Sequence, residues 1–215
     1  LREQDSLCLT DTGFLGGVHT LKRELRKHKW DHLPIRNIFL THGHIDHIWN
    51  VRELISESGA STAGPLQDLD FYTGDHSYQG MGKLTGLAEA FAIKAFRFRP
   101  FRVERFLESD EILGQDGDLK MIPLPGHTNG HCGFYWESRK LLFCGDLFAS
   151  FKHLSHPPPS PFNENGREVR SSLGKALELD LQGVLPNHCD RASPETHLMR
   201  LEKLAQRHEV REKKK

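Results

Sequence analysis

The order of apolar segments predicts an α/β protein in which two β-sheets face each other and helices cover their outer sides. Short apolar runs typical of buried strands recur along the chain, and segments with apolar residues at helical spacing lie between them. The 215 residues are enough for one domain with a proper hydrophobic core. We therefore expect residues 1–215 to form a single domain.

The first half of the chain alternates strands and helices. Residues 6–11 alternate in polarity and predict a strand, and residues 37–40 predict a second strand. Apolar residues at helical spacing predict one helix over 17–29 and another that starts at residue 48, directly after a histidine-rich loop. This alternation is typical of strand, loop and helix units whose loops carry ligands.

The second half is richer in antiparallel strands. Asp116-Gly117 and the polar residues 137–140 each separate two apolar runs, and both predict β-hairpins. Apolar residues on one face predict helices over 167–181 and 194–208, with a strand at 183–187 between them.

The charge balance and the absence of long apolar stretches exclude several classes of partner. Lys and Arg together number 29, as do Asp and Glu, so no net charge favours nucleic acid or anionic lipid. No apolar stretch approaches the roughly 20 residues that cross a bilayer, and the first residues do not show the basic-then-apolar pattern of an export leader. We expect a cytoplasmic protein without membrane or nucleic-acid partners, whose four cysteines are reduced thiols. The oligomeric state is left open.

A histidine-rich loop gives the first indication of function. The segment Thr41-His42-Gly43-His44-Ile45-Asp46-His47 places four metal-capable side chains within six positions. Imidazole and carboxylate groups are the ligands of zinc-like ions, and several of them must converge on one point to bind such an ion. A lone pair of histidines would be weak evidence, so the rest of the chain has to supply further ligands.

Three further candidate ligands follow apolar runs that are typical of buried strands. They are His127, Asp146 and His188, and glycines at 126 and 145 permit sharp turns beside the first two. Together with the loop they make five histidines and two aspartates. A single catalytic zinc takes three protein ligands and a water, so seven ligands predict two ions.

These motifs resemble the metallo-β-lactamase-fold hydrolases, the superfamily that includes glyoxalase II and the acyl-homoserine lactonases. The matching motifs, in chain order, are Thr-His-x-His-x-Asp-His, Pro-Gly-His-Thr-x-Gly-His, Cys-Gly-Asp and a late Pro-x-His, and the resemblance spans Asp11 to His188. It implies a four-layer αβ/βα sandwich. Family members have further strands before the first Asp-x-Gly turn, so we expect the N-terminal edge strands to be missing or shortened here.

The resemblance also implies roles for individual residues. His42, His44 and His127 would hold one ion, while Asp46, His47 and His188 would hold the other. Asp146 would bridge the two ions, and Asp11 would lie behind the loop and orient a ligand or the backbone. The ions would be zinc, with iron or manganese as alternatives, and a hydroxide between them would attack the carbonyl of an ester, thioester or lactone. Asp46 could also accept a proton transiently.

Three other functions remain open at this point. The same fold hosts iron-dependent oxidoreductases, including persulfide dioxygenases, which use one iron and fewer ligands. It also hosts β-lactamases. A binding module without activity would be expected to have lost ligands, whereas this chain keeps the full set. The sequence therefore favours a metal-dependent hydrolase with a small-molecule substrate.

Residues 65–108 form a long, aromatic-rich segment between the histidine-rich loop and His127. Phe71 and Tyr72 come early, and a later stretch alternates phenylalanines with arginines up to Phe106. The segment is either a lid beside the active site or a helix and strand whose aromatic side chains fill the core. Stacking on nucleic-acid bases is disfavoured by the neutral net charge.

Overall fold

The computed structural model describes residues 1–75, 98–114 and 116–212. The chain forms two compact units. The N-terminal unit comprises residues 1–108 and 113–117, and the C-terminal unit comprises residues 109–112 and 118–215. Each unit has its own sheet and its own hydrophobic core.

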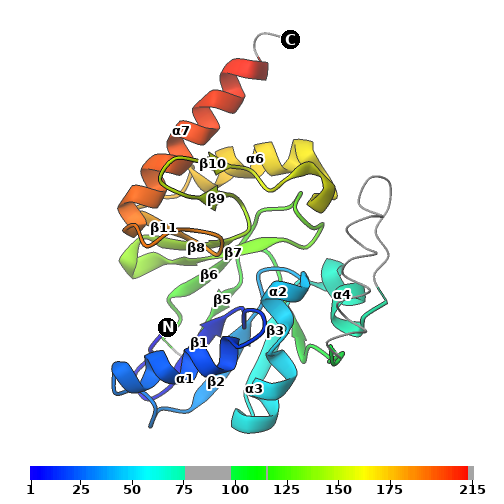
Figure 1. Ribbon diagram of the computed structural model, residues 1–215, viewed down its shortest axis with the longest axis vertical. Coiled ribbons are helices and arrows are strands. Elements are labelled where there is room, and N and C mark those ends of the chain that lie inside the picture. Colours follow the sequence, from blue (N-terminus) through cyan, green and yellow to red (C-terminus); the bar gives the residue numbers. More distant parts are fainter. Residues whose placement is uncertain (76–97, 115, 213–215) are drawn as a thin grey trace. The chain divides into compact units, whose positions relative to one another are not determined.

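The N-terminal unit is built on a parallel sheet in the order β1-β2-β3-β4 (Figure 1). Its strands are β1 (Leu7–Thr10), β2 (Ile35–Phe39), β3 (Ser61–Gly64) and β4 (Arg105–Phe106), and each neighbouring pair runs parallel. Parallel neighbours require crossover connections, which helices supply here. The predicted strands at 6–11 and 37–40 are confirmed with slightly shifted ends.

This unit also contains the helices α1 (Gly17–Lys27), α2 (Ile45–Ile48), α3 (Val51–Ser58) and α4 (Leu69–Thr73) and the 3-10 turn η1 (Leu66–Asp68). Val18 of α1, Ile38 of β2 and Leu54 of α3 meet in its core. The helix predicted from residue 48 was wrong in one respect. A separate turn of helix, α2, begins at Ile45, because His44 has extended backbone angles and the helix starts directly after it.

The C-terminal unit contains a five-stranded sheet in the order β11-β8-β7-β6-β5, except that Leu113 of β5 belongs to the N-terminal unit. Its strands are β5 (Ile112–Leu113), β6 (Leu119–Pro123), β7 (Cys132–Trp136), β8 (Leu141–Gly145) and β11 (Gly183–Pro186). Strands β6, β7 and β8 are antiparallel, whereas β11 runs parallel to β8. The 3-10 turn η3 (Glu137–Arg139) connects β7 to β8, which confirms the second predicted hairpin.

Two helices cover one face of this sheet, as Figure 1 shows for α6 (Gly166–Ala176) and α7 (Pro194–Glu212). Leu173 of α6 and Leu201 of α7 pack in one core with Leu142 of β8. The helix predicted over 167–181 ends earlier, because the amides of residues 177–179 bond to carbonyls three residues back and tighten the last turn. A short hairpin of β9 (Ala149–Ser150) and β10 (Ser155–His156) and the 3-10 turn η4 (Ser160–Phe162) lie between β8 and α6.

The described parts of the aromatic-rich segment contribute to the core of the N-terminal unit. Tyr72 is fully buried, and Phe98 and Phe101 lie in the same cluster. Phe106 is part of β4 at the sheet edge and is 39% exposed. Residues 76–97, which make up half of the segment 65–108, lie outside the described residues, so the lid stays a prediction.

Within the described part of the chain, no helix has the length and apolar character needed to span a bilayer.

Replacing Leu173 by alanine should destabilise the C-terminal unit. The side chain is fully buried between α6, α7 and the sheet, so its removal leaves a cavity and costs about 2–5 kcal/mol of unfolding free energy. Met199→Ala on α7 is the control, because that side chain is 51% exposed and its loss should cost less than about 0.5 kcal/mol. Chemical denaturation of the purified variants measures both values, and equal midpoints would contradict this description of the core.

Candidate metal centre

The histidine-rich loop of the N-terminal unit runs from the end of β2 into α2. It brings three imidazole rings together, with ring centroids 4.0 Å apart for His42 and His47 and 4.8 Å apart for His42 and His44. Asp46 follows on α2, with a carboxylate oxygen 3.6 Å from Nε2 of His47. The four predicted ligands of this loop therefore lie in one cluster.

Asp11 holds this loop from behind. Its backbone has a φ of 57°, an uncommon conformation for a residue with a side chain, and it directs the carboxylate at the loop. The carboxylate accepts hydrogen bonds from the amide of Thr41 at 2.8 Å, the hydroxyl of Thr41 at 2.7 Å and Nδ1 of His47 at 2.9 Å. Asp11 thus contacts both the backbone and a candidate ligand, as expected from its position, although its effect on metal binding stays a prediction.

These contacts determine which nitrogen of each ring carries the proton. A carboxylate only accepts hydrogen bonds, so Nδ1 of His47 is the donor toward Asp11. The Thr41 hydroxyl gives its hydrogen to Asp11, so Nδ1 of His42, 3.0 Å from that hydroxyl, donates as well. In the neutral form of both rings Nε2 is therefore the nitrogen that can bind a metal.

Two residues that sequence reasoning missed also shape this loop. Asp68 is fully buried, and its carboxylate accepts a hydrogen bond from the amide of Gly43 at 2.7 Å. Asn50 donates from its side-chain amide to the carbonyls of residues 12, 13 and 14, which fixes the turn after Asp11. No sequence signal marks either residue, because their partners are backbone groups far away in the chain.

In the C-terminal unit, the three strand-end candidates converge on one carboxylate. Oδ2 of Asp146 lies 3.5 Å from Nε2 of His127 and 3.1 Å from Nε2 of His188. Ligand atoms on one tetrahedral ion with bonds of 2.0–2.1 Å are roughly 3.4 Å apart. The spacing and the donor types therefore fit a metal ion, and the role of Asp146 as a ligand shared by two ions stays a prediction.

His131, the last residue of the Pro-Gly-His-Thr-x-Gly-His motif, has a different role. Its Nδ1 lies 2.8 Å from the carbonyl oxygen of Leu124, and its Nε2 accepts the backbone amide of Asp146 at 3.0 Å. Both ring nitrogens are used in these bonds, so His131 supports the turn that carries Asp146. The motif itself was the available signal, since it contains a second histidine that the ligand set does not use.

A buried polar network supports the segment that carries His188. The amide of Ser150 donates to the carbonyl of His188 at 2.8 Å, and the Ser150 hydroxyl lies 2.7 Å from Nδ1 of His197 on α7. Arg200, also on α7, donates to the carbonyl of Ser150 at 3.2 Å and to the carboxylate of Asp190 at 2.9 Å. Side chains of α7 thus hold Ser150, which bonds to the backbone of His188, and Asp190, which follows His188 in the sequence. The hydrogen bond from Arg200 also lowers the pKa of Asp190.

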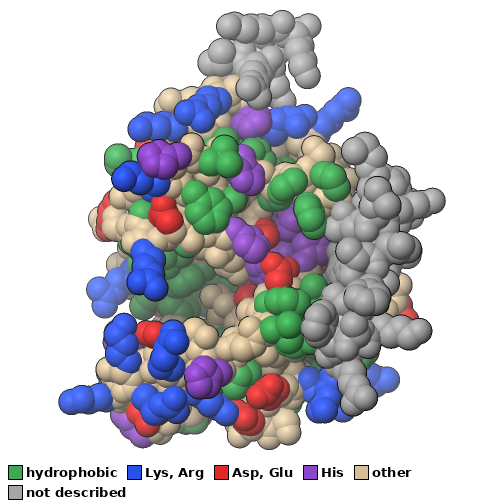
Figure 2. Space-filling model, in the orientation of Figure 1, with side chains coloured by type: hydrophobic (Ala, Val, Ile, Leu, Met, Phe, Trp, Pro, Cys, Tyr) green, Lys and Arg blue, Asp and Glu red, His purple; other side chains and the backbone are tan. Residues whose placement is uncertain are grey.

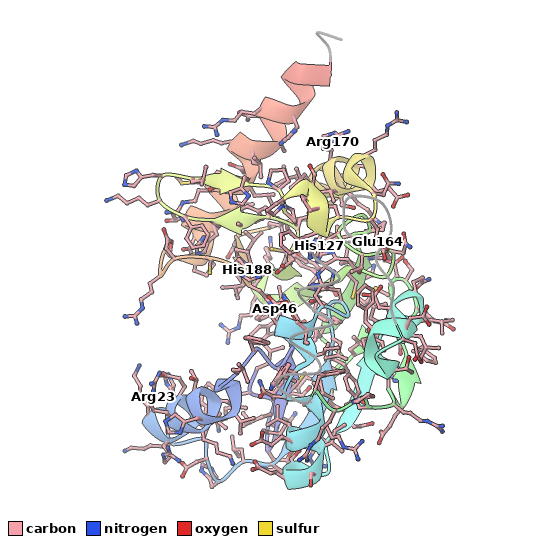
Figure 3. All side chains as sticks on the ribbon, turned by 45° about the vertical axis from the view of Figure 1, so that its right-hand side comes forward. Arg23, Asp46, His127, Glu164, Arg170 and His188 are labelled. Atoms are coloured by element: carbon pink, nitrogen blue, oxygen red, sulfur yellow. The ribbon has the colours of Figure 1, made fainter. Side chains whose placement is uncertain are left out.

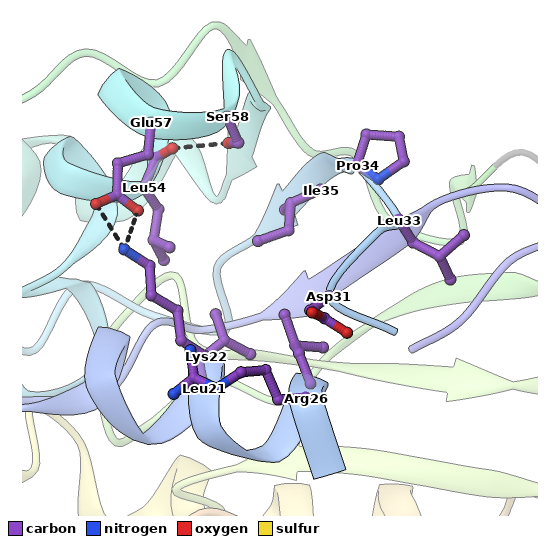
Figure 4. A pocket seen from close by; sticks show the side chains of 11 residues that line it. Leu21, Lys22, Arg26, Asp31, Leu33, Pro34, Ile35, Leu54, Glu57 and Ser58 are labelled. Atoms are coloured by element: carbon purple, nitrogen blue, oxygen red, sulfur yellow. Dashed lines mark hydrogen bonds and ion pairs between the residues drawn. The ribbon is translucent and has the colours of Figure 1, made fainter. Parts of the chain in front are cut away.

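The N-terminal unit also has a cavity of about 490 Å³ between α1, α3 and the start of β2 (Figure 4). Aliphatic side chains such as Leu21, Leu25 and Leu54 line it, and the ion pair between Lys22 and Glu57 crosses it. None of its lining residues is a candidate metal ligand. Figure 2 shows Lys and Arg side chains on the surface over α1.

Gly43→Ala should weaken metal binding. A Cβ at this position would overlap the side chain of Phe71, including its Cβ, so the backbone between His42 and His44 would have to move. We expect a loss in metal affinity of about 10–100-fold, the size found when supports of metal ligands are removed. Titration against a chromophoric chelator measures it.

Gly174→Ala is the matched control for this change. Gly174 lies inside α6, no atom lies within 4 Å of the added Cβ, and alanine favours the helix by about 1 kcal/mol. Its metal affinity should equal that of the wild type. Wild-type affinity in Gly43→Ala would show that the loop tolerates displacement.

Acid should destabilise the C-terminal unit in part through His197. Burial, followed by the charge of Arg200, lowers the pKa of this imidazole below its ordinary value of about 6.5. The unfolded chain therefore binds a proton more readily than the folded one, and stability falls as the pH drops below about 6.5. His197→Gln should show a shallower loss of unfolding free energy between pH 7 and pH 5, and an identical slope would contradict this.

Comparisons with known proteins find hydrolases among the relatives of this chain. The chain is 22% identical over 203 residues to a probable metallo-hydrolase, YflN, of Bacillus subtilis, covering 86% of this chain and 76% of YflN. It is 30% identical over 122 residues to the hydroxyacylglutathione hydrolase GloC of Haemophilus influenzae, covering 54% of this chain and 50% of GloC. The alignment with GloC therefore spans about half of that relative.

A solved structure has a fold similar to that of this chain. The solved structure of TTHA1623 in a di-iron-bound form matches with a TM-score of 0.60 at 24% identity, covering 83% of this chain and 80% of that one. This likeness confirms the α/β fold class predicted from the sequence. The family model of the metallo-beta-lactamase superfamily matches residues 1–188. The chain therefore belongs to the metallo-beta-lactamase superfamily.

Proposed function

We propose that this protein is a dinuclear metal-dependent hydrolase that adds water to the carbonyl carbon of an ester, thioester or lactone and breaks its acyl C–O or C–S bond. His42, His44 and His127 would hold one ion, while Asp46, His47 and His188 would hold the other. Asp146 would bind both. This division of ligands is the one that the resemblance to the superfamily implies. Within each unit the candidate ligands lie close together, which supports a metal site.

The arrangement around Asp146 is the observation that carries the proposal. One carboxylate oxygen faces Nε2 of His127 and Nε2 of His188, and all three side chains come from the ends of different strands. A buried carboxylate beside two imidazoles is expensive unless a cation or hydrogen bonds stabilise it. Metal binding by these three side chains, with Asp146 as the shared ligand, would account for their arrangement.

The N-terminal unit supports the proposal through the protonation of its rings. Asp11 and Thr41 hold the protons of His42 and His47 on Nδ1, so both rings offer Nε2 in the neutral state that metal binding requires. Zinc-class ions bound by such ligands lower the pKa of water to about 7 and polarise a substrate carbonyl. The side chains contribute orientation, and Asp46, whose carboxylate is 39% exposed, is available to accept a proton from the nucleophilic water.

The substrate class rests on relatives and on charge. GloC is named as a hydroxyacylglutathione hydrolase and YflN as a probable metallo-hydrolase, and an acyl group carried by the thiol of glutathione is a thioester. We therefore place thioesters first, followed by lactones and other esters. A polyanionic substrate is disfavoured, because acidic and basic residues are equal in number.

The direct test combines metal analysis with a substrate panel. The purified protein should contain two zinc-class ions per chain by mass spectrometry, and it should hydrolyse thioesters or lactones in a panel that includes β-lactams and phosphodiesters. Removing the metal with a chelator should abolish turnover, and added zinc should restore it. Iron together with oxygen consumption would instead support an oxidoreductase and refute the hydrolase.

Asp146→Ala should lower both metal content and turnover. Loss of the shared ligand removes a bond to each ion, and we expect turnover to fall by at least about 1,000-fold, which corresponds to about 4 kcal/mol of activation free energy. Asp180→Ala is the control, because it removes a carboxylate of the same unit that is 75% exposed. Asp146→Ala with two bound ions and full turnover would refute the ligand assignment.

A further inference from the structure

A side chain outside the recognised motifs contacts the ring of His127 directly. Asn163 follows the 3-10 turn η4, and its Oδ1 lies 3.0 Å from Nδ1 of His127. The imidazole is 4% exposed, so water has little access to it. This contact joins residues 36 positions apart in the same unit.

The proline-rich loop fixes the orientation of the Asn163 amide. The Nδ2 group of Asn163 donates to the carbonyl oxygen of Pro158 at 2.8 Å. A carbonyl only accepts, so the NH₂ group must face Pro158 and the oxygen must face His127. The nitrogen of His127 opposite that oxygen is therefore the donor, which means that Nδ1 carries the proton.

The same segment holds the backbone around His127. The amide of Glu164 donates to the carbonyl of His127 at 3.1 Å, and the amide of Asn165 donates to the carbonyl of Gly126 at 2.9 Å. Gly126 has a φ of 125°, and a Cβ there would overlap the backbone of Val169. Figure 3 shows His127 and Glu164 close together. Ring and backbone of His127 are thus held by one short segment.

We infer that Asn163 is a positioning residue that keeps the proton of His127 on Nδ1 and so leaves Nε2 to bind metal. Nε2 is the nitrogen that faces Asp146, at 3.5 Å. Partners of the second ring nitrogen fix the tautomer and orientation of metal-binding histidines in general. The inference rests on the proposed metal site, and it assigns the proline-rich loop a role, since Pro158 orients Asn163.

Two substitutions distinguish the two contacts of Asn163, its oxygen that accepts from His127 and its amide nitrogen that donates to Pro158. Asn163→Ala and Asn163→Asp both lose the donor to Pro158, but aspartate keeps an oxygen that accepts from Nδ1. Zinc affinity, measured by competition with a chromophoric chelator, should fall about 10–100-fold for one ion in Asn163→Ala. In Asn163→Asp it should stay within about threefold of the wild type, because a carboxylate is a common partner of a metal-binding histidine.

Nitrogen-15 NMR of the imidazoles gives a readout that a purely structural role would not move. In the metal-free wild type and in Asn163→Asp, His127 should show the Nδ1-protonated tautomer. In Asn163→Ala it should show a mixture of both tautomers. His131, whose Nδ1 is bonded to the carbonyl of Leu124, should keep its tautomer in every variant and serves as an internal control.

Asn129→Ala is the matched control, because Asn129 lies two residues after His127 and its side chain is exposed. Its zinc affinity should equal that of the wild type. Equal weakening in Asn163→Ala and Asn163→Asp would show that the loop anchor alone matters and would overturn the inference, as would an unchanged tautomer in Asn163→Ala. Wild-type protein that binds no metal would refute the proposed function, while the tautomer measurement would still decide about Asn163.

Discussion

A histidine binds a metal ion only through a nitrogen that carries no proton, and this requirement gives a reason for the contacts to Nδ1 of three candidate ligands. In the N-terminal unit the Nδ1 protons of His42 and His47 are held by Thr41 and by the carboxylate of Asp11. In the C-terminal unit Nδ1 of His127 faces the amide oxygen of Asn163. In three rings of two separate units, a hydrogen-bonding partner thus lies at Nδ1, which leaves Nε2 for the proposed metal ion.

Buried carboxylates form the second layer of the design. Asp11 and Asp68 are at most 6% exposed and each accepts hydrogen bonds from the histidine-rich loop. Burying a charged group is costly, and the cost is offset only when its oxygens are hydrogen-bonded. These two side chains therefore exchange solvation for contacts that fix a loop between β2 and α2. The loop in turn needs glycine at position 43, because Phe71 occupies the space of any side chain there.

The strands and the ligand types were predictable because both depend on local patterns. Short apolar runs are typical of buried strands, and His127, Asp146 and His188 follow such strands by one to four residues. Element ends were less predictable. Helix α2 begins inside the ligand loop, and α6 ends before residue 181, because backbone angles and turn bonds that leave little trace in the sequence set these limits.

The sequence by itself determined the superfamily, the α/β class and the set of imidazole and carboxylate candidates, since spacing within motifs and apolar periodicity are local properties. Only the tertiary structure decided which polar groups support each candidate. Asp68 bonds to the backbone of Gly43, Asn163 bonds to the ring of His127, and Arg200 bonds to the carbonyl of Ser150. The two residues of each pair are 25 or more positions apart in the sequence. Such partners are chosen by folding, because a hydrogen bond requires proximity in space and places no constraint on distance along the chain.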